Sequence, residues 1–233
     1  MYNRDYLSNQ STQYTQESSQ AQLMSFLKAT YQLFAGSLLA ATAGAYIGLG
    51  IVSILMGPVK WVLFAVELAL IFFVIPKVKH TPGLNLAVLF AFTFISGLTI
   101  APLLTSIFNM PGGASIVGQA FLMTSVAFGG ISMFAMTTKR DFSSMGKFLF
   151  IALIIMIVAG ISNIFIQSSM MQLAIASAGA LLFSAFILYD TQQIIKGNYD
   201  SPIEAALSLY LDFFNLFISL LQILGIMNSG DKE

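Results

Sequence analysis

The sequence contains no cysteine, which excludes disulfide bonds, thiolate metal sites, iron–sulfur clusters and cysteine nucleophiles. Charge is also scarce, because 9% of the 233 residues are Asp, Glu, Lys or Arg, against about 25% in an ordinary soluble domain. Ten basic and ten acidic residues cancel, so no net positive field attracts nucleic acid. With 57% hydrophobic residues, the chain is too poor in charge to cover a water-facing surface. These deficits predict a protein embedded in the lipid bilayer.

The polar residues are concentrated at the N-terminus. Residues 1–27 are rich in Ser, Thr, Gln and Asn and lack a basic region followed by an apolar core, so they predict a disordered cytoplasmic tail and no cleaved signal. We expect residues 28–228 to form a transmembrane domain and residues 229–233 a short C-terminal tail. One crossing needs about 20 apolar residues, which leaves room for six to eight helices.

Charges and turn residues divide the apolar part of the chain into seven spans. Residues 81–138 carry no charge, and this stretch is too long for one helix; it divides at the Pro111-Gly112-Gly113 turn. We therefore predict an all-α membrane protein with seven transmembrane helices. The expected spans are about 30–55, 60–76, 84–108, 114–137, 147–166, 172–195 and 203–226.

The distribution of Lys and Arg between the connecting segments predicts the orientation. With seven spans, one face receives eight basic residues and the other receives only Lys60 and Lys232. This asymmetry predicts a cytoplasmic N-terminus and an outside C-terminus. The eight are Arg4, Lys28, Lys77, Lys79, Lys139, Arg140, Lys147 and Lys196.

Small residues recur every four positions in the first span. Such a row allows another helix to approach backbone to backbone, so we expect a packing seam along it. Its members are Gly36, Ala40, Gly44 and Gly48.

Three carboxylates lie inside the expected spans: Glu67, Asp190 and Asp212. An acid at the centre of a transmembrane helix costs about 2.5–3.5 kcal/mol even on lenient insertion scales, so intramembrane acids usually face a bundle interior and mark an ion or proton path. The alternative for each is a protonated, hydrogen-bonded packing residue. Glu67 lies near mid-membrane, where it would serve as a relay or a second gate residue.

Asp190 and Asp212 are expected to form a pair. Asp190 lies six residues before Lys196 and Asp212 about nine after the turn at Pro202, so both lie roughly 9–14 Å inside the cytoplasmic boundary. Two carboxylates in hydrogen-bonding reach in a poorly solvated site tend to share one proton. The pair is therefore predicted to sense pH.

The seventh span carries a polar stripe at spacings of four, three, four and three, which places its members on one helical face. Two interpretations stay open: the stripe lines a hydrated ion path, or it belongs to a central helix that hydrogen-bonds to its neighbours. The stripe consists of Ser208, Asp212, Asn215, Ser219 and Gln222.

Three sequence segments resemble the Bax inhibitor-1 (transmembrane Bax inhibitor motif) family, especially its small bacterial members. They are residues 186–192 (FILYDTQ), residues 209–217 (LYLDFFNLF) and residues 96–102 (SGLTIAP). The resemblance covers residues 25–228. It implies a bacterial inner-membrane protein with seven helices, the last wrapped by the other six, that leaks calcium across the membrane in a pH-sensitive way.

The resemblance also implies roles for individual residues. Asp190 and Asp212 match the paired aspartates of the family, and they would act as the proton sensor and as transient calcium ligands. In bacterial relatives an arginine at the end of the second helix latches onto the pair. Here only Lys77 and Lys79 lie near that position, and lysine lacks the bidentate fork of arginine.

We therefore predict a calcium leak channel gated by protonation of Asp190 and Asp212, with Glu67, Ser208, Asn215 and Ser219 along the ion path. No cofactor is expected, and calcium is the transported ion. The alternative is a non-conducting regulator that binds a membrane protease or stress-pathway protein, with an unknown membrane-protein partner. An intramembrane aspartyl protease is a weaker rival, because Asp212 lacks the Gly-x-Gly-Asp motif of that class, so no enzymatic activity is expected.

Overall fold

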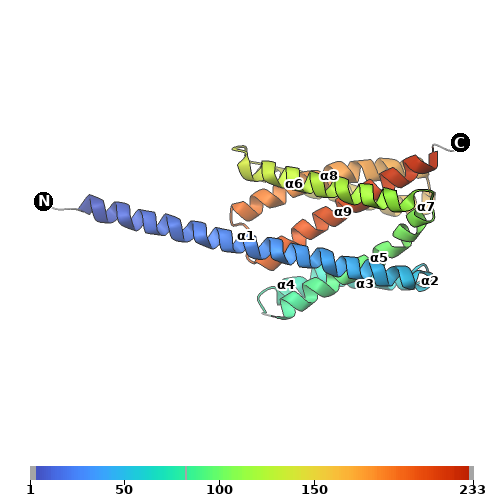
Figure 1. The fold of residues 1–233 in the computed structure, drawn as a ribbon, viewed down its shortest axis with the longest axis horizontal. Coiled ribbons are helices and arrows are strands. Elements are labelled where there is room, and N and C mark those ends of the chain that lie inside the picture. Colours follow the sequence, from blue (N-terminus) through green and yellow to red (C-terminus); the bar gives the residue numbers. More distant parts are fainter. Residues whose placement is uncertain (1–3, 82, 231–233) are drawn as a thin grey trace.

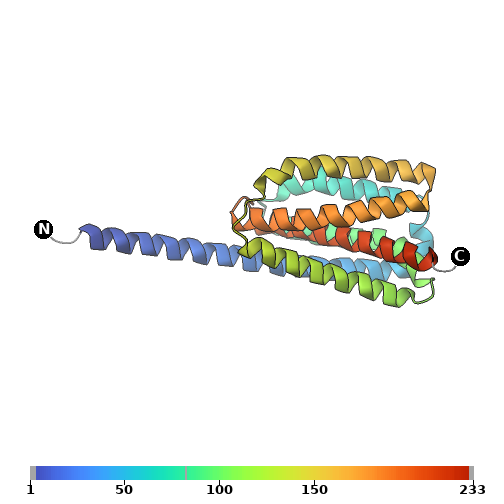
Figure 2. The ribbon, with the colours of Figure 1, turned by 90° about the horizontal axis from the view of Figure 1, so that it is seen from above.

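The computed structural model describes residues 4–81 and 83–230, and this part of the chain is helical without any strand (Figures 1 and 2). The elements are α1 (Arg4–Gly50), α2 (Val52–Leu55), α3 (Val59–Ala69), the π-helical η1 (Leu70–Val74), α4 (Ile75–Val78), α5 (Leu84–Phe108), α6 (Gly113–Thr137), the 3-10 helix η2 (Ser143–Met145), α7 (Gly146–Ile166), α8 (Ser169–Ile195) and α9 (Pro202–Gly230).

Seven helices in the described residues are long and apolar enough to cross a membrane, which confirms the predicted fold class. The second span is built from α3, η1 and α4. Its π-helical turn lies just before Pro76, which has no N–H to donate and whose ring would crowd the carbonyl of Phe72 in a regular α-helix. The spans are Gln20–Gly50, Val59–Val78, Leu84–Phe108, Gly113–Thr137, Ser143–Ile166, Ser169–Ile195 and Pro202–Ser229.

The N-terminal segment differs from our expectation of a disordered tail. Helix α1 begins at Arg4 and runs without a break into the first span, and its first part projects beyond the bundle (Figure 1). The first glycine is Gly36, and no proline precedes it. Because the segment lacks both strong helix-breaking residues, the helix of the span continues toward the N-terminus.

Close packing of α1 against α5 confirms the predicted small-residue seam. A Cβ atom added at Gly44 would lie 2.0 Å from the carbonyl oxygen of Phe94, and one added at Gly97 would lie 2.0 Å from the carbonyl oxygen of Ala41. One added at Gly48 would lie 2.6 Å from the Cβ of Ala101. The two backbones therefore touch at positions that only glycine allows.

Helix α9 is the most buried span, with 44% of its most apolar window inside the protein. Its backbone packs against α1, α5, α6 and α8, and Figure 2 shows it near the middle of the bundle. Helix α7 packs against α8. Wrapping of the last helix by all six others stays a prediction.

Candidate functional site

Two buried carboxyl groups lie on the adjacent helices α8 and α9. Asp190 lies near the C-terminal end of α8 and is 6% exposed, and Asp212 lies in the first half of α9 and is 4% exposed. Residues 196–201 join the two helices and return the chain, so that α9 packs along α8. The structure therefore places both acids in the interior of the bundle, near the end where α8 turns into α9.

Ser208 connects the two acids. Its hydroxyl donates a 2.5 Å hydrogen bond to Oδ2 of Asp190, and it lies one helical turn before Asp212 on α9. The hydroxyl of Tyr199, in the loop between the helices, donates to Ser208 Oγ at 2.9 Å. The Ser208 hydroxyl thus holds the carboxyl group of Asp190 against the first half of α9.

Asp212 has fewer hydrogen-bond partners than Asp190. Its carboxyl group interacts with that of Asp190, yet its Oδ2 is buried without a hydrogen-bond partner in the described part of the protein. A buried, unpaired carboxylate costs several kcal/mol or more, so the group needs a proton or a cation at this oxygen. The role of the pair in sensing protons or binding calcium stays a prediction.

The predicted lysine latch has a different partner from the one expected. Lys79 Nζ lies 2.9 Å from Asp200 Oδ2 and 3.2 Å from Glu204 Oε1, while Lys77 is exposed. Lys79 follows the last turn of the second span, at the level of the α8–α9 loop, whereas the buried aspartates lie deeper. The lysine therefore ties the second span to the loop and to the first turn of α9, and not to Asp190 or Asp212.

Glu67 is hydrogen-bonded to a different helix from the aspartate pair. The hydroxyl of Thr99 on α5 donates a 2.9 Å bond to Glu67 Oε1. One turn earlier on α5, Ser96 bonds the hydroxyl of Tyr210 on α9. The structure thus joins Glu67 to α5 and brings Tyr210 to the same stretch of α5. Asp212 instead faces Asp190 of α8.

The polar stripe of α9 faces α8 along much of its length. Ser219 Oγ lies 2.7 Å from where a Cβ of Gly179 would be, and Gln222 Oε1 accepts a 2.9 Å bond from Gln172 Nε2. Asn215 instead donates to the carbonyl of Leu211 in its own helix, at 2.8 Å. The contacts of Ser219 and Gln222 favour helix packing at the C-terminal end of the stripe, and its role in an ion path stays a prediction.

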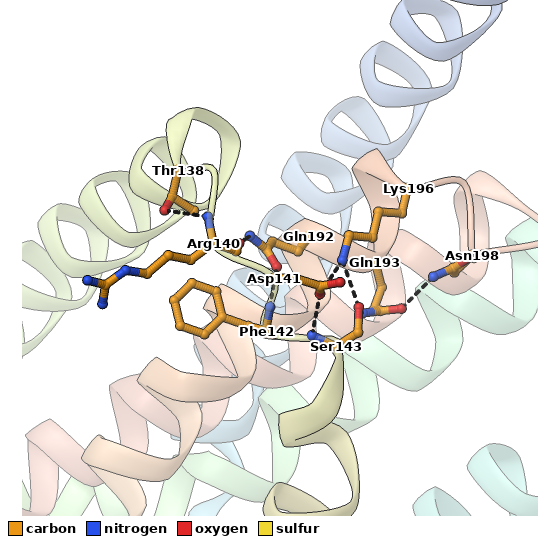
Figure 3. A network of polar contacts seen from close by, with 9 residues as sticks. All are labelled: Thr138, Arg140, Asp141, Phe142, Ser143, Gln192, Gln193, Lys196 and Asn198. Carbon is orange, nitrogen blue, oxygen red and sulfur yellow. Dashed lines mark hydrogen bonds and ion pairs between the residues drawn. The ribbon is translucent and has the colours of Figure 1, made fainter.

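A network that the sequence did not reveal fixes the α6–α7 loop to the end of α8 (Figure 3). Gln192 accepts a 2.9 Å bond from the N–H of Phe142 and donates a 2.8 Å bond to the carbonyl of Arg140. Lys196 binds Asp141, whose pKa it lowers below the ordinary range, and donates to Ser143 Oγ at 2.8 Å. The only signal in the sequence was polar residues at the buried end of an apolar helix.

No group of three or more His, Asp or Glu side chains that would hold a resident metal occurs in residues 4–81 and 83–230 as the structure describes them. The aspartate pair alone offers too few ligands for a permanent calcium site, since Ca²⁺ takes 6–8 oxygen ligands. Transient binding of calcium at this pair stays a prediction.

Comparison with known proteins identifies the family. The family described as "Inhibitor of apoptosis-promoting Bax1" matches residues 23–229. An uncharacterized protein of Campylobacter jejuni is 53% identical over 98% of this chain and 99% of its own, and an uncharacterized membrane protein of Vibrio cholerae is 42% identical over 88% and 91%. The mouse protein lifeguard 4 is 38% identical over 73% and 70%. The chain is a multi-pass membrane protein that belongs to the Bax inhibitor-1 family.

Proposed function

We propose that this protein lets Ca²⁺ pass slowly across the inner membrane and that protonation of Asp190 and Asp212 controls the flux. One observation carries the proposal: Asp212 Oδ2 is buried beside a second carboxyl group and has no hydrogen-bond partner among the described residues. Carboxylate oxygens are preferred ligands of hard cations such as Ca²⁺. A proton and a calcium ion would therefore compete for the same oxygen atoms.

The position of the pair supports a gating role. Asp190 and Asp212 lie at the packed interface of α8 and α9, so a change in their charge acts directly on the contact between these helices. Acid would neutralise the pair, which removes the mutual repulsion of the two carboxylates and also their attraction for cations. These two consequences have opposite effects on the calcium flux. We therefore expect the flux to change with pH, and the two effects together decide whether it rises or falls in acid.

The experiment is a calcium-flux assay in liposomes from about pH 5 to 8, a range in which acidic and near-neutral conditions are compared. Wild type is compared with Asp190→Asn and Asp212→Asn, which keep the size of each side chain and remove its charge. We expect both variants to lose the pH dependence. Unchanged flux and an unchanged pH profile in both variants would refute the proposal.

A regulatory role without conduction is the second candidate. The name of one relative, protein lifeguard 4, names neither an ion nor transport. Pure wild-type protein that carries no calcium in liposomes, but that copurifies with a specific membrane protein, would favour this role.

We also propose that the N-terminus lies in the cytoplasm and the C-terminus outside, as the distribution of basic residues predicts.

A further inference from the structure

We propose that the α6–α7 loop binds the phosphate headgroup of an anionic membrane phospholipid through Lys139, Arg140 and Lys147. This lipid site is separate from the aspartate pair, and lipid binding there does not depend on whether the protein passes calcium. Three features of the loop support the assignment: an excess of positive charge, a backbone fixed by hydrogen bonds, and exposed apolar side chains on both flanking helices.

The charges of the loop are positive and unbalanced. Lys139, Arg140 and Lys147 are exposed, and none of them forms an ion pair within the part of the chain that the structure describes. Asp141 is the one acidic residue of the loop, and Lys196 of the neighbouring α8–α9 turn binds its carboxylate. The loop therefore keeps three positive charges for a partner from outside the protein, and a phosphate group complements them.

Arg140 has a fixed backbone and a side chain that extends away from the hydrogen bonds of the loop (Figure 3). Its N–H donates to Thr138 Oγ1 at 3.3 Å, and its carbonyl accepts a 2.8 Å bond from Gln192 Nε2. Gln192 is 5% exposed on α8, so this bond anchors the loop to the interior of the bundle. A guanidinium group can bind two phosphate oxygens at once, and a backbone that is already fixed loses little entropy on binding.

The start of α7, which carries Lys147, is fixed to the same end of α8. Ser143 begins the 3-10 turn that leads into α7, and its N–H donates to Asp141 Oδ1 at 2.8 Å. The Ser143 hydroxyl accepts a 2.8 Å bond from Lys196 Nζ. Hydrogen bonds that join α6, α7 and α8 therefore hold the segments that carry all three basic side chains, so a lipid bound to them would also stabilise this end of the bundle.

Exposed apolar side chains flank the loop on both sides. Phe134 and Met136 lie near the end of α6, and Phe148 follows Lys147 on α7. The ring of Phe134 also contacts that of Phe142 in the loop, with the centroids 6.4 Å apart. These helices are membrane spans, so the basic loop lies where acyl chains give way to headgroups. A phospholipid matches both the basic loop and its apolar flanks, whereas a free anion matches only the loop.

Basic residues in a loop also help to orient a membrane protein, and that role needs charge without a fixed geometry. The chain provides a matched control for this alternative. Lys28, Lys60 and Lys77 are exposed as well, but they lie far apart in the sequence, on three different helices. A headgroup site needs the grouped charges of the loop, whereas general attraction to an anionic surface depends on the number of charges alone.

The test is a titration of the purified full chain in neutral detergent with phosphatidylglycerol, followed by native mass spectrometry. We expect wild type to bind this anionic lipid more tightly than zwitterionic phosphatidylcholine, and high salt should weaken the binding. Each basic residue near anionic lipid contributes about fivefold in affinity, so the triple change Lys139→Gln, Arg140→Gln and Lys147→Gln should weaken it by about a hundredfold. Arg140→Lys keeps the charge but loses the planar fork, and it should weaken binding by less than Arg140→Gln.

Amide hydrogen exchange locates the site. Phosphatidylglycerol should slow exchange in residues 138–147 of wild type and should have no effect there in the triple loop variant. Without lipid, this variant should unfold at the wild-type temperature, because the structure as described gives none of its three altered side chains an ionic partner. The single change Arg140→Gln, with an expected loss of about fivefold in affinity, provides a second measure that does not depend on the fold of the triple variant.

The control variant carries Lys28→Gln, Lys60→Gln and Lys77→Gln, which remove the same amount of charge. It should bind phosphatidylglycerol nearly as tightly as wild type does. Equal weakening in the two triple variants would overturn the proposal, because general charge attraction would then explain the binding. Equal affinity for the anionic and zwitterionic lipids would also overturn it. Slowed exchange of the loop with inorganic phosphate alone would indicate a site for a free anion and would overturn the assignment to a lipid.

Discussion

Lys79 Nζ donates a 2.9 Å hydrogen bond to Asp200 Oδ2 and so ties the end of the second span to the α8–α9 loop. This bond is the main reason why the pKa of Lys79 is raised and that of Asp200 is lowered. The contribution of Lys79 is lost only as pH rises past about 10.4, and that of Asp200 only as pH falls below about 3.9. The pair therefore stays charged near neutral pH, and a pH response there originates at another group.

Replacement of Lys79 by Gln should loosen the loop without altering the pH dependence. We expect faster amide hydrogen exchange in residues 197–201, measured by mass spectrometry, because the loop loses its ion pair to the second span. High salt should produce a similar change in wild type, since it screens exposed charges. Lys77→Gln is the control, because Lys77 is exposed nearby. A shift in the pH midpoint of calcium flux in Lys79→Gln would contradict the assignment of the pH response to the aspartate pair.

Gly97→Ala should destabilise the bundle. The added Cβ would lie 2.0 Å from the carbonyl oxygen of Ala41, so α1 and α5 must separate. Overpacking costs about 1–3 kcal/mol and backbone contacts relax less easily than side chains, so we expect the upper part of this range or more. The measurement is thermal unfolding in detergent. Gly129→Ala is the control, because its Cβ would meet no atom within 4 Å, and equal midpoints for the two variants would disprove the contact.

Gln192→Leu should release the α6–α7 loop from α8. The change keeps the approximate size of the side chain and removes both hydrogen bonds to the loop backbone, at Phe142 and Arg140. Loss of partners for two partly buried backbone groups costs about 1–3 kcal/mol each. We expect faster amide exchange in residues 138–145, with Gln119→Leu as control, since Gln119 is exposed and bonds only Ser115 of its own helix. Unchanged exchange would show that the loop is held by other contacts.

The sequence predicted the seven helices because the length and hydropathy of each span depend on local composition alone. It also placed Asp190 and Asp212 in the buried interior near the turn between α8 and α9, because the turn at residues 196–201 sets the depth of both. It did not predict that Lys79 binds Asp200, that Gln192 binds the α6–α7 loop or that Glu67 binds Thr99. These contacts depend on the rotation and crossing angle of each helix, which periodicity leaves open.

The bond between Thr99 and Glu67 yields a last prediction, which separates a structural role of Glu67 from a role in ion passage. Thr99→Val keeps the shape of the side chain and removes the donor to Glu67 Oε1, so the carboxyl loses its partner on α5 at a cost of about 1–3 kcal/mol. In Glu67→Leu the hydroxyl of Thr99 keeps only the carbonyl of Ser96 in its own helix as an acceptor, so the same threonine change should cost less. A double-mutant cycle on thermal unfolding should therefore give a coupling energy of about 0.5–3 kcal/mol. Thr105→Val, whose hydroxyl bonds only the carbonyl of Ala101, should show no coupling to Glu67. Strictly additive effects of Thr99→Val and Glu67→Leu would mean that the hydrogen bond contributes nothing to stability, and this half-buried acid would then need another reason to lie in the membrane.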